Sequence, residues 1–126
     1  MNRIGIWIDH REAVIVSQAA GVTTTATVDS GIDGHPRFSA PRGAAGEKHY
    51  EARHEQQLDR FYDDVIGHLG APDALLIIGP GEARLELAAR LGQTPALAAC
   101  AVDVEAADRL TEPQIVAKVK AHFADW

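Results

Sequence analysis

The sequence predicts an α/β fold with a mixed sheet and the element order β-β-β-α-β-α-β-α. Short apolar and β-branched runs, separated by brief polar turns, fill the first 29 residues and are typical of hairpin strands. Apolar residues at three- and four-residue spacing then alternate with further strand-like runs, which is the pattern of helices between strands. Such an alternation folds stably when the helices cover the faces of the sheet.

Composition and charge narrow the function classes. The chain has 126 residues, 46% of them hydrophobic and 24% charged, which suits one globular domain over residues 1–126. The net charge of −6 argues against a broad nucleic-acid-binding face, so we expect no DNA partner. No apolar stretch approaches the roughly 18 residues of a membrane span, so we expect no membrane association and a cytoplasmic location.

The predicted strands and helices are separated by recognisable turns. Residues 4–8, 13–17 and 22–29 form a three-stranded meander, in which the last strand alternates Thr with Val or Ala as an edge strand does. The later elements are a long helix at 49–69, a buried strand at 74–78, a helix at 81–91, a strand at 95–104 and a final helix at 111–126. A Thr-Glu-Pro-Gln capping box begins that last helix.

Residues 30–48 have a different composition from the rest of the chain. They are rich in Gly and Pro, which break regular structure, so we expect a long flexible loop. Basic residues outnumber acidic ones here, which indicates either a basic arm or an ordinary loop of mixed charge. The candidates for salt-sensitive contact with RNA phosphate are Arg37, Arg42, Lys48 and Arg53.

Four stretches carry a resemblance to a known family, namely GIWIDHREAVIV, HYEARHEQQLDRFYDDVIGHL, ALLIIGPGEARLELAARL and RLTEPQIVAKVKAHF. In these stretches and in its element order, the chain resembles the middle domain of the archaeo-eukaryotic class of peptide-chain release factors, in particular its small bacterial relatives. The resemblance implies a single ribonuclease-H-like domain. It also implies a role in translation.

One departure from that family bears on catalysis. Active members carry a Gly-Gly-Gln triplet in the loop before the long helix, and this triplet enters the ribosomal peptidyl-transferase centre to help release the peptide. Here residues 40–48 read APRGAAGEK, and no Gly-Gly-Gln occurs in the sequence. We therefore expect a non-catalytic, translation-associated accessory protein that contacts the ribosome or tRNA through the 30–48 loop.

Two other function classes remain open. The first is a metal-dependent nuclease with a ribonuclease-H-like site at Asp9, which would need several more carboxylates converging on the same metals. The alternative role for Asp9 is to shape the hairpin turn with its side chain. The second class is a protein-interaction module, with a homodimer through an edge strand as one form.

The remaining candidates are an anion-binding turn and a metal site. Gly79, Gly81 and Arg84 surround the start of a helix, where free N–H groups attract anions, although a purely structural turn explains the same residues. The Gly-Lys-Ser/Thr end of a P-loop is absent. No Cys pair or His-Glu-x-x-His pattern indicates zinc, so we expect no metal and no cofactor.

Overall fold

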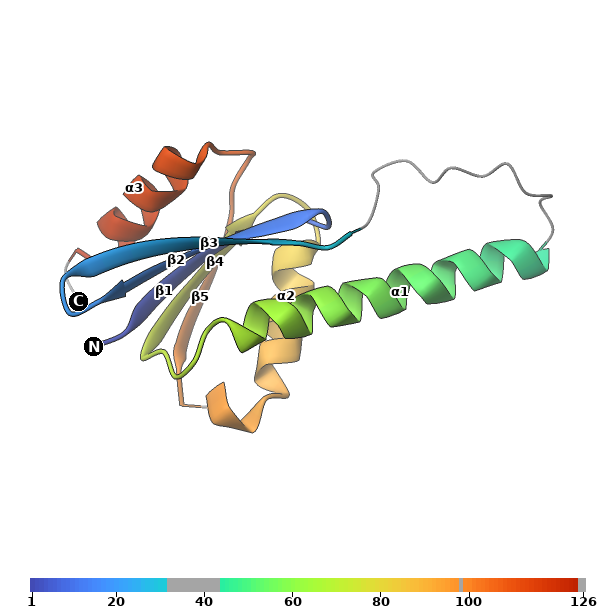
Figure 1. Cartoon of the computed structure of the whole chain (residues 1–126), viewed down its shortest axis with the longest axis horizontal. Helices are drawn as coiled ribbons and strands as arrows, with labels where there is room; N and C mark the ends of the chain where they lie inside the picture. Colours follow the sequence, from blue (N-terminus) through green and yellow to red (C-terminus); the bar gives the residue numbers. More distant parts are fainter. Residues whose placement is uncertain (32–43, 98, 125–126) are drawn as a thin grey trace.

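The computed structural model describes residues 1–31, 44–97 and 99–124. For residues 44–54 it describes the backbone but not the side chains. The predicted α/β class and element order are confirmed (Figure 1). The elements are β1 (Arg3–Ile8), β2 (Glu12–Ala19), β3 (Val22–Asp29), α1 (Ala44–Gly67), β4 (Ala74–Gly79), α2 (Ala83–Gly92), a short 3₁₀ helix (Pro95–Leu97), β5 (Ala101–Ala106) and α3 (Glu112–His122).

The sheet is mixed, and its strand order is β3-β2-β1-β4-β5. β1 lies in the centre, antiparallel to β2 and parallel to β4, so that Ile6 is opposite both Ile15 and Ile77. β3 pairs antiparallel with β2, and β5 pairs parallel with β4. The short turns of the meander permit antiparallel pairing, whereas each parallel pair needs a helical crossover, which α1 and α2 provide.

The helices cover the two faces of the sheet separately. Phe61 and Val65 of α1 and Leu87 of α2 pack on one face in a single core cluster with Ile6 and Ile77. α3 packs on the other face, where its residues Ile115 and Val119 and its C-cap residue Phe123 join Trp7 and Leu76. This two-sided burial explains why the β4 sequence is apolar at every position. Among the described residues, no helix has the length and apolarity that a membrane span needs.

Several predicted boundaries were wrong; for example, the final helix ends at His122 and not near residue 126. The two largest differences are at the start of the long helix and at the start of the last strand. α1 begins at Ala44 instead of residue 49, so the last five residues of the predicted 30–48 loop are helical. The strong helix formers Ala, Glu and Lys in that stretch explain the earlier start, despite one glycine. Residues 32–43 of the predicted loop lie outside the described residues.

The second large difference is the start of the last strand, which is Ala101 and not residue 95. Pro95 begins a 3₁₀ helix, because its fixed φ suits a first helical position. The turn continues through hydrogen bonds from Leu97 N to Thr94 O and from Cys100 N to Leu97 O, both 3.0 Å long. The chain therefore joins the sheet only after this turn.

Candidate functional site

The predicted RNA-contacting residues lie on or before the start of α1. Arg37 and Arg42 fall outside the described residues. Lys48 and Arg53 lie on α1, although their side chains also fall outside the described part. Figure 1 shows that the N-terminal half of α1 runs beyond the sheet, so the backbone at these two positions lies away from the core.

Asp9 is held in the turn between β1 and β2. Its Oδ1 accepts hydrogen bonds from the N–H groups of Arg11 (2.8 Å) and Glu12 (2.9 Å), and its Oδ2 lies 3.7 Å from Nη1 of Arg109. Across the described ranges, no three His, Cys, Asp or Glu residues are grouped so that they could hold a metal ion. The contacts of Asp9 therefore favour the turn-shaping interpretation over the nuclease hypothesis.

The turn from β4 into α2 is held by hydrogen bonds between its own residues. Gly81 has a φ of +66°, and Arg84 donates from Nη1 to the carbonyl oxygens of Gly79 (3.4 Å) and Gly81. Glu82 occupies the N-cap position of α2. A carboxylate at this position interacts favourably with the helix dipole, and it would repel a bound anion. These contacts favour a structural turn over an anion-binding site.

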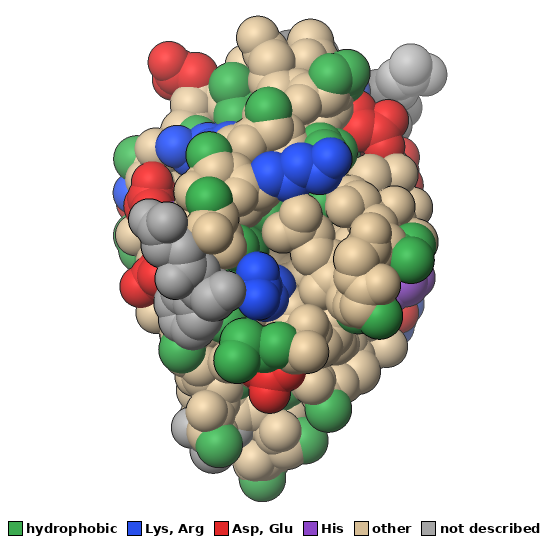
Figure 2. Space-filling view, turned by 90° about the vertical axis from the view of Figure 1, so that its left-hand side faces the viewer, with side chains coloured by type: hydrophobic (Ala, Val, Ile, Leu, Met, Phe, Trp, Pro, Cys, Tyr) green, Lys and Arg blue, Asp and Glu red, His purple; other side chains and the backbone are tan. Residues whose placement is uncertain are grey.

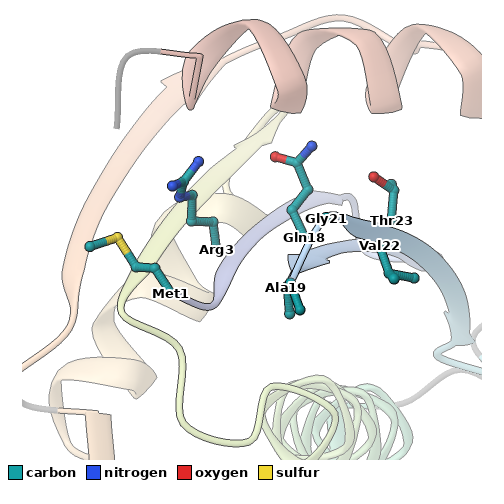
Figure 3. Close-up of a pocket in the computed structure, with 8 residues that line it drawn as sticks. Met1, Arg3, Gln18, Ala19, Gly21, Val22 and Thr23 are labelled. Atoms are coloured by element: carbon teal, nitrogen blue, oxygen red, sulfur yellow. The ribbon is translucent and has the colours of Figure 1, made fainter.

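A pocket that the sequence analysis did not predict lies at the end of the sheet near Met1. Its volume is about 340 Å³, within the range of small-ligand sites. Arg3, Gln18 and Thr23 line it in one row, because Arg3 is opposite Gln18 and Gln18 is opposite Thr23 across β1, β2 and β3. Figure 3 shows these three side chains pointing the same way, toward α3.

The chemistry of this pocket suits an oxygen-rich anion. Arg3 offers a planar guanidinium, one nitrogen of which donates to the carbonyl oxygen of Phe123 at 3.3 Å, while Gln18 adds an amide and Thr23 a hydroxyl. Figure 2 shows both basic and acidic side chains on this end of the molecule, and Arg3 is the basic residue that lines the pocket. The sequence signal was three polar residues at strand ends, but only the strand register brings them together.

A second hollow, of about 350 Å³, lies between α1 and α2. Glu86 is its central contact, because one carboxylate oxygen accepts a hydrogen bond from the Tyr62 hydroxyl and lies 3.0 Å from Nε2 of His10. Nearby, Arg90 donates from Nε and Nη2 to the two carboxylate oxygens of Asp63. These contacts tie α1, α2 and the β1–β2 turn together, and so fix how α1 leaves the sheet.

The Tyr62 hydroxyl predicts a pH dependence of stability. Burial raises the pKa of Tyr62 well above its usual range, and the hydrogen bond to Glu86 raises the pKa further. The unfolded residue ionises near pH 10, so the stability that Tyr62 contributes is complete below about pH 10 and is lost as the pH rises above it. Above that pH we expect the free energy of unfolding to fall less steeply with pH in Tyr62→Phe than in the wild type. The difference between the two slopes should correspond to the release of about one proton on unfolding. Urea unfolding from neutral to alkaline pH measures both slopes, and equal slopes would contradict the prediction.

Comparisons with known proteins locate the fold. No family model matches the chain, and no curated protein matches it. Among solved structures, it is similar to the Thermoplasma acidophilum Pelota protein, with a TM-score of 0.57 and 20% sequence identity, covering 96% of this chain and 32% of that chain. It is also similar to the archaeal translation termination factor aRF1, with a TM-score of 0.49 and 13% identity, covering 98% of this chain and 39% of that chain.

The similarity is one of fold. The chain spans about a third of the Pelota chain that it matches, and the identity is low. The α/β class expected from the sequence is thereby confirmed, and the fold is similar to that of part of Pelota. The assignment to the middle domain in particular stays a prediction.

Proposed function

We propose that this chain is a non-catalytic, translation-associated accessory protein that contacts the ribosome or tRNA through residues 30–48 and the start of α1. Two kinds of similarity support the proposal. Four stretches of the sequence resemble the middle domain of release factors, and the fold matches part of Pelota along 96% of the chain. The absence of Gly-Gly-Gln from the sequence is the reason for proposing binding without peptide release.

The distribution of charge along the sequence supports a contact through this segment. Residues 30–48 hold three of the 12 Lys and Arg but only two of the 18 Asp and Glu, so this segment has a net charge of +1 and the remainder a net charge of −7. An RNA surface repels the acidic remainder and attracts the basic segment. The electric field of the RNA therefore orients the protein with the start of α1 and the preceding segment toward the RNA.

The experiment is binding of the purified protein to ribosomes and to tRNA across a salt series from about 50 to about 200 mM. The test variant changes Arg37, Arg42 and Lys48 to Ala together. Each lost phosphate contact should reduce the slope of log affinity against log salt by about one, and should weaken binding to every RNA sequence alike. Cosedimentation with ribosomal particles and filter binding of tRNA measure the two partners separately.

A matched control removes the same charge elsewhere. Arg11, Arg60 and Lys120 are exposed side chains outside the 30–48 segment, and changing all three to Ala should leave the salt slope unchanged. An equal loss in both triple variants would contradict the assigned contact, because it would report net charge alone. Failure of the wild-type protein to bind at about 50 mM salt would refute the proposed function.

A further inference from the structure

The two edges of the sheet are β3 and β5, and each edge strand presents a row of backbone N–H and C=O groups that can pair with another chain. Natural edge strands are commonly protected by charged residues, proline or a bulge. Residues 22–28 of β3 contain no charged residue and no proline. All but Ala26 and Val28 are exposed. β3 is therefore an edge that is ready to accept a partner strand.

We propose that β3 pairs antiparallel with β3 of a second copy of this chain, about a two-fold axis at Thr25, and so joins the two five-stranded sheets into one. A two-fold axis perpendicular to the sheet keeps each face continuous, so residues opposite each other must point to the same face. A register centred on Thr25 meets this condition. It also uses all seven residues of the uncharged segment, Val22 to Val28.

The sequence of this segment is self-complementary in that register. It reads VTTTATV and is nearly the same in both directions. On the face that α3 covers, Thr25 is opposite its own copy and Thr23 is opposite Thr27 of the second copy. Threonine pairs directly opposite each other across two strands stabilise a sheet through hydrogen bonds and packing. All three threonines are exposed in the single chain, so they are available for these pairs.

The other face of β3 gains an apolar contact in the same register. Val22 is 60% exposed, and it would lie opposite the largely buried Val28 of the second copy. Thr24 would lie opposite Ala26, and neither of these side chains is charged. The pairing thus covers an exposed valine at each end of the interface.

β5 cannot make the equivalent pair. Asp103 and Glu105 share the face that α3 covers, since both contact the His122 imidazole. In β5, every face-matched antiparallel register that pairs more than three residues places one of these carboxylates opposite another. Like charges directly opposite each other destabilise a sheet. The two edges therefore differ, and self-association is directed to β3.

Salt separates this proposal from the RNA-binding proposal, on which it does not depend. Each copy carries a net charge of −6, so two copies repel each other and salt screens that repulsion. Dimerisation through an uncharged strand should strengthen as salt rises, whereas contact with RNA phosphate should weaken. Opposite salt trends in one preparation would show two separate surfaces.

The test uses charge at the two-fold axis. Thr25→Lys places two lysines opposite each other in the dimer, and Thr25→Glu places two glutamates there, so each variant alone should dimerise about tenfold or more weakly than the wild type. An equimolar mixture restores an opposite-charge pair and should dimerise again. Val102→Lys on β5 is the control and should keep the wild-type dimerisation constant, because it adds the same charge at the other edge.

Sedimentation velocity over a protein concentration series gives the dimerisation constants, and circular dichroism confirms that each variant is folded. Association of the wild type, loss in both single variants and recovery in the mixture is the expected result. A wild type that is monomeric at every concentration overturns the proposal. So does a mixture that fails to recover, or a variant pattern in which Val102→Lys is the disruptive change.

Discussion

Replacing Gly79 with alanine is expected to lower the free energy of unfolding by roughly 2–5 kcal/mol, from steric overlap and backbone strain together. A Cβ atom at this position would lie 2.0 Å from the carbonyl oxygen of Ile8. That oxygen belongs to the backbone of β1, the central strand, so no side-chain rotation can relieve the overlap. The φ of +156° at Gly79 is also one that L side chains rarely adopt. Either β1 or β4 must therefore move, and the helices that pack on these two strands lose contacts.

Urea unfolding followed by circular dichroism measures this loss. Gly67→Ala is the matched control, because an added Cβ there meets nothing within 4 Å. Gly67 ends α1, so the control should change stability by no more than about 1 kcal/mol. If Gly79→Ala were as stable as Gly67→Ala, the close approach of the β4 turn to β1 would be wrong.

Local signals were sufficient to predict the fold where one segment determines its own structure. The capping box of α3 is an example: Thr111 Oγ1 accepts the N–H of Gln114 at 3.3 Å, and Gln114 Oε1 accepts the N–H of Thr111 at 2.9 Å. The four-residue turn around Asp9 likewise gave the first hairpin. Both features depend only on residues within one turn of the chain.

The sequence was insufficient where the structure depends on several elements at once. The Ala-rich run before Ala101 has neither helical nor strand periodicity, so its turn around Pro95 was not foreseen. The pocket row of Arg3, Gln18 and Thr23 depends on the register of three strands, which a sequence pattern does not give. The basic residues of the 30–48 segment stay predictions, because their side chains lie outside the described residues.

The second large effect is expected at Trp7, which supports the α3 side of the molecule. Its side chain is 2% exposed, and its indole N–H donates to the carbonyl oxygen of Asp108 at 3.1 Å. The guanidinium carbon of Arg109 lies 5.7 Å from the centre of the ring, and Arg109 also pairs with Glu12 at 3.0 Å. Trp7 therefore joins β1 both to α3 and to the connection between β5 and α3. We expect Trp7→Ala to cost roughly 3–5 kcal/mol.

Trp7→Phe separates the hydrogen bond from the packing. Phenylalanine keeps most of the buried ring but leaves the Asp108 carbonyl oxygen without its indole donor, which should cost about 1–3 kcal/mol. The expected order of unfolding free energies is therefore wild type, then Trp7→Phe, then Trp7→Ala, each measured in urea. If both variants lost the same free energy, the hydrogen bond would account for the whole effect and the packing of the ring for none of it.

The folded Trp7→Phe variant also tests where RNA contacts the protein. Trp7 packs in the α3 cluster, whereas α1 packs on the opposite face of the sheet. If residues 30–48 and the start of α1 carry the contact, Trp7→Phe should bind ribosomes and tRNA with the wild-type salt slope while unfolding more easily. A loss of binding in this variant would move the contact surface to the α3 face, because a modest loss of stability leaves almost all of the protein folded.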